Sequence, residues 1–174
     1  MIILLTGGAA CGKSSYGEKI CMSFSGPKYY IATMQPFGDD RLKKIERHQR
    51  IRAGKGFETI EKYTDLADVK IPKNGTVLLE CICTLTANEM FDINGNMSDP
   101  RKKVLDGVAT LAQQSENLII ITNDVGSDSK DYSESTMSYI HALHEINITL
   151  ANESDHVYEL VCGIPLVLKG NLII

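Results

Sequence analysis

Short apolar runs alternate with longer mixed segments along most of this chain. The runs IILL, VLL and LIII are apolar almost throughout, rather than at every second position. Strands with that pattern are buried on both faces, which is typical of a parallel sheet covered by helices. We expect strands at residues 2–6, 28–33, 76–82, 117–122, 156–161 and 165–169.

The segments between these runs predict helices. Asp99 followed by Pro100 is a helix start signal, because the Asp can cap the helix and Pro fits its first turn. Only the letters CGIP separate the last two strands, so we expect a terminal β-hairpin there. Elsewhere, right-handed crossovers would give a three-layer α/β sandwich in one domain, residues 1–174. Helices are expected at residues 13–23, 39–53, 85–91, 99–115 and 133–153.

Composition restricts which partners the protein can bind and indicates its cellular compartment. The chain has 174 residues and a net charge of −4, so it has no basic field for nucleic acid. No apolar run approaches the roughly 18 residues of a membrane span. The five cysteines, with no signal peptide before them, indicate reduced thiols in a cytoplasmic protein. Cys81 and Cys83 have the spacing of half a metal site, but no second pair completes it, which favours buried strand thiols.

The letters TGGAACGKSS carry the strongest chemical signal. They lie between an expected strand and an expected helix, and they match the P-loop pattern G-x4-G-K-S. Glycines let successive backbone N–H groups point at phosphate oxygens, and the helix N-terminus adds partial positive charge. Lys13 would reach the β- and γ-phosphates, while the Ser14 hydroxyl would ligate Mg²⁺. The sequence thus predicts a P-loop NTPase-like fold whose phosphate cradle is Gly7, Gly8, Ala9, Ala10, Cys11, Gly12, Lys13 and Ser14.

A P-loop enzyme also needs an acid at the end of a second buried strand. Glu80 ends the run TVLLE and is the candidate for holding Mg²⁺ or its water, the alternative being a strand-end Glu with no task. Asp124 is a weaker candidate for the same region. Thr33, at the carboxyl end of its strand, is expected to line the nucleotide site, since open α/β sheets bind ligands there. The chain lacks the guanine-reading motif Asn-Lys-x-Asp, so a small-molecule kinase is the generic expectation.

A basic segment around His48 carries a second signal. Lysines and arginines lie one, two and four positions away, at Lys44, Arg47, Arg50 and Arg52. Such neighbours would lower the pKa of the His, keep it neutral and nucleophilic, and attract phosphate. The alternative is a solvated basic face with an incidental His.

Seven stretches in order decide between these alternatives: TGGAACGKS, YYIAT, DDRLKKIERH, AGKGFETIE, LLECICTLTANEMF, ITNDVG and VCGIPLVLKG. Together they resemble the bifunctional adenosylcobinamide kinase / adenosylcobinamide-phosphate guanylyltransferase family of cobalamin biosynthesis. The resemblance implies phosphorylation of adenosylcobinamide by ATP or GTP, then transfer of GMP from GTP through a GMP–histidine intermediate. It implies His48 as nucleophile, with Lys13 and Glu80 in the catalytic set, Arg52 and Glu61 in the nucleotide site, and a homotrimer.

The sequence departs from this family at three places, one of them after His48, where Ala53 replaces a Pro and Phe57 stands for a Trp. The family usually has Arg-Ser where this chain has Ala10-Cys11, and the segment after Gly126 lacks the family's Pro and arginines. Two alternatives therefore remain: a P-loop small-molecule kinase without guanylyl transfer, and a non-catalytic nucleotide-binding relative.

Overall fold

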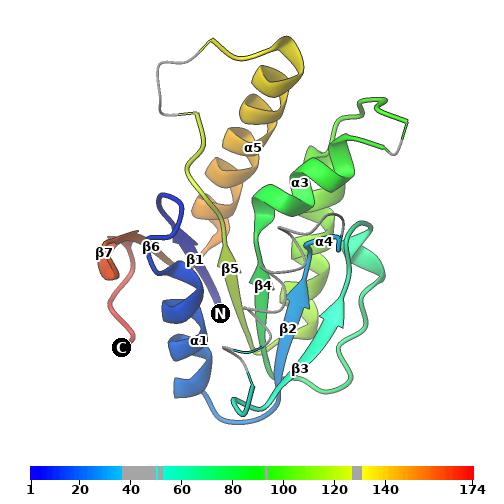
Figure 1. The fold of residues 1–174 in the computed structure, drawn as a ribbon. Coiled ribbons are helices and arrows are strands. Elements are labelled where there is room, and N and C mark those ends of the chain that lie inside the picture. The colour runs from blue at the N-terminus through cyan, green and yellow to red at the C-terminus, as the bar shows by residue number, and fades with distance from the viewer. Residues whose placement is uncertain (37–49, 51–52, 93, 127–130) are drawn as a thin grey trace.

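The fold is built on one seven-stranded sheet (Figure 1). The structure is a computed structural model that describes residues 1–36, 50, 53–92, 94–126 and 131–174. The strand order is β3-β2-β4-β5-β1-β6-β7, in which only the β6–β7 pair is antiparallel. The strands are β1 (Ile2–Thr6), β2 (Lys28–Ala32), β3 (Phe57–Glu61), β4 (Thr76–Glu80), β5 (Asn117–Ile121), β6 (His156–Val161) and β7 (Ile164–Lys169).

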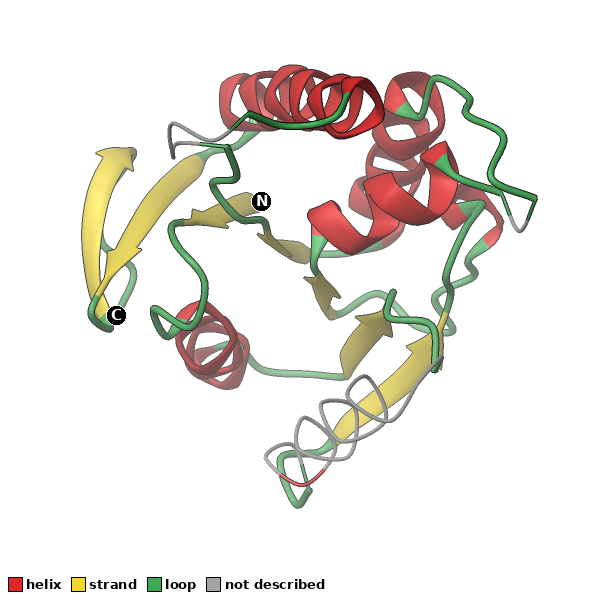
Figure 2. Cartoon of the chain, turned by 45° about the horizontal axis from the view of Figure 1, so that its top comes forward, coloured by secondary structure: helices red, strands yellow, loops and turns green. Residues whose placement is uncertain are grey.

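Helices cover both faces of the sheet, as Figure 2 shows from its upper edge. One face packs on α1, and the other packs on α3, α4 and α5. Successive residues of a strand point to opposite faces, so Ile3 and Leu5 enter the core beneath α1 while Leu4 enters the other core. Both cores are apolar, which explains why the central strands carry continuous apolar runs. The helices are α1 (Lys13–Ser23), α3 (Ile82–Met90), α4 (Arg101–Gln114) and α5 (Glu134–Glu153), with a 3₁₀ turn at Leu66–Asp68.

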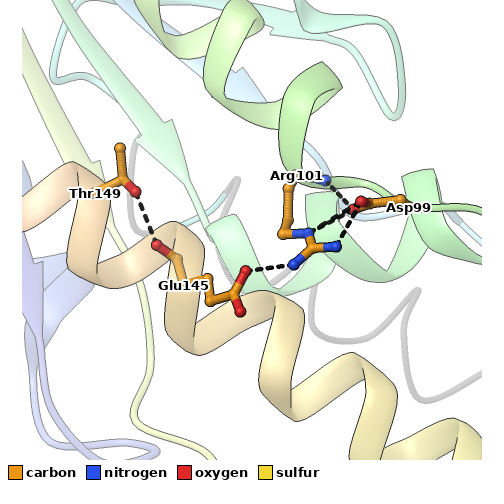
Figure 3. Close-up of polar contacts among 4 residues, drawn as sticks. All are labelled: Asp99, Arg101, Glu145 and Thr149. Carbon is orange, nitrogen blue, oxygen red and sulfur yellow. Dashed lines mark hydrogen bonds and ion pairs between the residues drawn. The ribbon is translucent and has the colours of Figure 1, made fainter.

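An exposed ion-pair cluster joins α4 to α5 (Figure 3). The Arg101 guanidinium donates to both carboxylate oxygens of Asp99 and, on its other side, to Glu145 of α5. Asp99 also accepts the Arg101 backbone N–H at 3.1 Å. Asp99 thus accepts the first backbone N–H of α4, whose N-cap residue is Pro100 rather than the predicted Asp99, and Arg101 ties that start to the neighbouring helix.

The α/β class, the mostly parallel sheet and the terminal hairpin are confirmed, while two other local expectations were wrong. The sequence analysis missed β3, whose half-exposed pattern with Glu58 and Glu61 suits an edge strand. It extended β4 to residue 82, whereas Cys81 has a φ of 63° and caps α3, which begins at Ile82. The helix expected at residues 39–53 lies almost wholly outside the described residues.

No described helix has the length and apolar character needed to cross a membrane.

Candidate functional site

The phosphate-binding loop occupies the turn between β1 and α1. Its backbone has positive φ at Gly7 (127°), Ala10 (58°) and Gly12 (101°). The two glycines adopt these angles without steric cost, whereas Ala10 carries backbone strain. Gly12 caps α1, and the helix N-terminus that follows favours anions. The strand–loop–helix context predicted for this motif is present.

Lys13 folds back over this loop. Its side chain is only 6% exposed, and Nζ donates to the carbonyl oxygens of Gly7 at 2.8 Å and Gly8 at 2.6 Å. The Cys11 sulfur is 3.4 Å from the same nitrogen. The cation is therefore held at the centre of the loop, against the backbone that is expected to receive phosphate.

The β6–β7 hairpin packs directly against the phosphate loop. Gly163, in the two-residue turn between β6 and β7, donates its backbone N–H to the Cys11 carbonyl at 2.8 Å. A Cβ on Gly12 would lie 3.2 Å from the Gly163 Cα, and one on Gly7 would lie 2.6 Å from the Leu160 carbonyl oxygen. These contacts require glycine and join the hairpin to the loop.

Glu80 and the loop line one cavity of about 370 Å³. Glu80 ends β4, beside β2 in the sheet, and is 7% exposed. Ser14, the other predicted Mg²⁺ ligand, lines the same cavity. A cavity of this size falls in the usual range for small-molecule sites. The structure thus brings Lys13, Ser14 and Glu80 together, although they come from two different elements.

Thr33 lies next to Glu80, but its side chain is fully buried. Its hydroxyl donates to the Glu80 carbonyl at 2.6 Å. The amide of Asn88, on α3, donates to the Thr33 carbonyl at 2.8 Å and to the Tyr63 carbonyl at 2.9 Å. This network fixes the carboxyl ends of β2 and β4 beside the cavity, so in this structure Thr33 braces the site through backbone contacts.

The Cys81 thiol also lines the cavity. Cys83 is helical rather than in a strand, which corrects the assignment of both thiols to a strand. Hydrogen bonding from the Cys83 thiol, and then from Thr84, lowers the pKa of Cys81 below its usual value. No cluster of metal-ligating side chains exists among the residues that the structure describes, so the half metal site gains no support.

Two further candidates among the described residues, Glu61 and Asp124, do not line this cavity. Glu61 ends the edge strand β3, is exposed, and accepts a hydrogen bond from Tyr63. Asp124 lines a separate cavity of about 330 Å³ with His144 and Glu159. His48 and Arg52 lie outside the described residues.

Sequence reasoning missed three side chains at or beside this site. The first is Asn88. The other two are Glu18 of α1, which lines the cavity, and Lys55, and they form an ion pair with 2.5 Å between Lys55 Nζ and Glu18 Oε2. Glu18 follows Ser14 by one helical turn, so its spacing alone placed it near the loop. Its partner and its burial could not be found from spacing.

A family model described as "Cobinamide kinase / cobinamide phosphate guanyltransferase" matches residues 3–168. The chain belongs to this family. Two proteins called "Bifunctional adenosylcobalamin biosynthesis protein CobU" are similar to it over 97% of this chain and their full length. The protein from Escherichia coli (strain K12) is 29% identical to this chain, and the one from Salmonella typhimurium (strain LT2) is 26% identical to it. A Pseudomonas aeruginosa protein called "Bifunctional adenosylcobalamin biosynthesis protein CobP" is 24% identical over 96% of both chains.

Two solved structures share the fold. A protein from Pyrococcus horikoshii OT3 superposes with a TM-score of 0.55 at 7% identity, over 99% of this chain and 87% of that one. An ATPase of a bacterial type III secretion system superposes with a TM-score of 0.53 at 12% identity, over 91% of this chain and 50% of that one. At such identities the likeness concerns the fold alone.

Proposed function

We propose that this protein phosphorylates adenosylcobinamide with ATP or GTP and then transfers GMP from GTP to the phosphorylated product, giving adenosylcobinamide-GDP. These two activities are the ones in its family's description. The observation that carries the proposal is the single cavity lined by Lys13, Ser14 and Glu80, in a chain that the family model covers almost completely. We take residues 1–174 as one catalytic domain.

The kinase step needs stabilised charge rather than covalent chemistry by the protein. The backbone N–H groups of residues 7–14 and the start of α1 would hold the β- and γ-phosphates. Lys13 would exchange its carbonyl partners for phosphate oxygens and offset the charge that spreads over them. The acceptor would be the hydroxyl of the aminopropanol arm of adenosylcobinamide, and we propose that Glu80 receives its proton.

Ser14 and Glu80 fit a Mg²⁺ site. Both offer oxygen atoms to the same cavity, and Mg²⁺ in nucleotide enzymes keeps several waters and needs only one or two protein ligands beside the phosphates. When bound there, the ion would neutralise phosphate charge.

For guanylyl transfer we propose His48 as the nucleophile. A neutral imidazole would attack the α-phosphorus of GTP in line, form a P–N bond and release pyrophosphate. The P-loop would hold the leaving pyrophosphate, and the phosphate of the phosphorylated cobinamide would then displace the imidazole. Arg52 and Glu61 are proposed to contribute to the nucleotide site.

Labelled GTP tests the proposal directly. The protein is incubated with α-³²P-GTP, denatured, and assayed for protein-bound label. We expect label that is lost in acid and kept in alkali, as a phosphoramidate requires, and that moves to phosphorylated cobinamide when this acceptor is added. Phosphoryl transfer to cobinamide without label would instead support a kinase alone. Absence of both reactions would support a non-catalytic nucleotide-binding relative.

We also propose that the protein is a homotrimer in the cytoplasm, as the family resemblance implies. The edge strand β7 supports a subunit contact, because Ile164, Leu166 and Leu168 are 64%, 46% and 60% exposed. Apolar side chains along an open strand edge are typical of a surface that another chain covers. All five cysteines are free thiols, which suits a reducing compartment.

Charge on β7 should therefore change the assembly state. We expect the wild-type protein to have three times the 19.2 kDa chain mass by light scattering, and Leu168→Lys to shift the population toward the monomer. Met22→Lys, at an exposed apolar position near the end of α1, should leave the mass unchanged. A wild-type monomer, or a Leu168→Lys variant that stays trimeric, would count against this interface.

A further inference from the structure

The wall of the nucleotide cavity contains a buried carboxylate that takes no part in the proposed phosphoryl or guanylyl transfer. Glu18 lies on α1 and is 2% exposed, and it lines the same cavity as the phosphate loop. Ionised side chains are seldom buried this deeply without a partner or a task. Its partner is Lys55, whose Nζ lies 2.5 Å from Glu18 Oε2 and whose side chain remains 37% exposed.

This ion pair presents a defined pattern of hydrogen-bonding groups. A carboxylate only accepts, and an ammonium group only donates, through three N–H bonds. Guanine has the complementary edge: O6 accepts, while N1–H and the 2-amino group donate. Adenine has the opposite arrangement at the first two positions, with a donating 6-amino group and an accepting N1. With Lys55 facing position 6 and Glu18 facing positions 1 and 2, the pair matches guanine and mismatches adenine.

The position of the pair in the cavity also suits a base. Glu18 follows Ser14 by four residues on α1, about 6 Å along the helix axis, so it lies one turn beyond the phosphate loop. Met34 lines the same cavity and offers a thioether against which an aromatic ring can pack. Phosphates at residues 7–14 and a base near Glu18 would thus occupy opposite parts of one site.

We propose that Glu18 and Lys55 select the guanine base of GTP, with Glu18 accepting N1–H and the 2-amino group and Lys55 donating to O6. Lys55 can do this while keeping its bond to Glu18, because its ammonium has three donors. The inference rests on the proposed use of GTP at this site, and it supplies the base recognition that the missing Asn-Lys-x-Asp motif leaves unassigned.

Xanthosine triphosphate (XTP) makes a sharp test, because it has a carbonyl oxygen where guanine has its 2-amino group. In Glu18→Gln, the side-chain carbonyl still accepts N1–H, but its amide now donates, which suits XTP. Calorimetric titration of the full chain with GTP, XTP and ATP should show GTP binding about ten- to a hundred-fold weaker than in the wild type. XTP should bind at least about tenfold tighter, and ATP binding should change less than about threefold.

Lys55→Met provides a second, independent variant. Both GTP and XTP carry O6, so both should weaken by a similar factor, about tenfold, while ATP should not. Lys102 and Asp106 form a matched surface ion pair on α4, so Asp106→Asn and Lys102→Met serve as controls and should alter none of the three affinities. Melting temperatures measured in parallel report whether each variant is folded.

Three results would overturn the inference. Unchanged GTP affinity in Glu18→Gln would remove the carboxylate from base recognition. Equal weakening of GTP, XTP and ATP would assign the pair a structural role only. A wild-type protein that binds GTP and ATP equally would refute base selection while leaving the proposed function intact, whereas one that binds neither nucleotide would refute both.

Discussion

Lys13→Ala is expected to abolish both phosphoryl transfer to cobinamide and uptake of label from α-labelled GTP. The Lys13 ammonium is the buried cation of the phosphate loop, and it lies within 2.8 Å of the Gly7 and Gly8 carbonyl oxygens. Without it, charge on the transferred phosphoryl group and on the leaving pyrophosphate loses its nearest positive partner in this loop. Removing one such preorganised group lowers kcat by roughly 100- to 1,000-fold, so we expect a loss near the upper end of this range in both assays.

The control for this variant is Lys19→Ala. Lys19 lies on the same helix but is exposed, so its removal changes the charge of α1 without touching the loop. Lys19→Ala should retain both activities. Because a buried side chain is removed in Lys13→Ala, the melting temperature must be measured for both variants. A folded Lys13→Ala protein with wild-type turnover would overturn the assigned role of the P-loop.

His48→Ala is expected to remove the covalent label completely while leaving kinase activity largely intact. In the proposed mechanism the imidazole supplies the atom that bonds to the α-phosphorus, and alanine has no nucleophile to replace it. Loss of the nucleophile should reduce guanylyl transfer by at least about 1,000-fold. The proposed transfer of the γ-phosphoryl group uses the loop, Lys13 and Glu80, and needs no covalent step at His48.

His141→Ala provides a matched control, since His141 is an exposed histidine on α5. It should keep full labelling with α-³²P-GTP and full phosphoryl transfer to cobinamide. Label that survives in His48→Ala would move the nucleophile to another residue. Loss of both activities in His48→Ala, with an unchanged melting temperature, would show that His48 serves both reactions and not guanylyl transfer alone.

Local patterns in the sequence predicted much of the framework. Continuous apolar runs gave the parallel strands at the centre of the sheet, because burial on both faces leaves no polar positions. The edge strand β3 lacks that pattern, since it is half exposed and carries Glu58 and Glu61, and it was missed. The start of α3 was placed three residues late, because the positive φ of Cys81 depends on its surroundings and leaves no mark in local hydrophobicity.

The sequence by itself determined the loop at residues 7–14, the position of Glu80 at the end of its strand and the terminal hairpin, because each depends on neighbours in the chain or on strand position. Only the tertiary structure decided which distant groups share the cavity. It placed Glu80 and Lys13 in one cavity and set the Gly163 turn against Gly12. It also paired Glu18 with Lys55 across 37 positions. These contacts depend on how α1 crosses the sheet, on the order of the strands and on where the hairpin packs. None of these can be predicted from the spacing of residues along the chain.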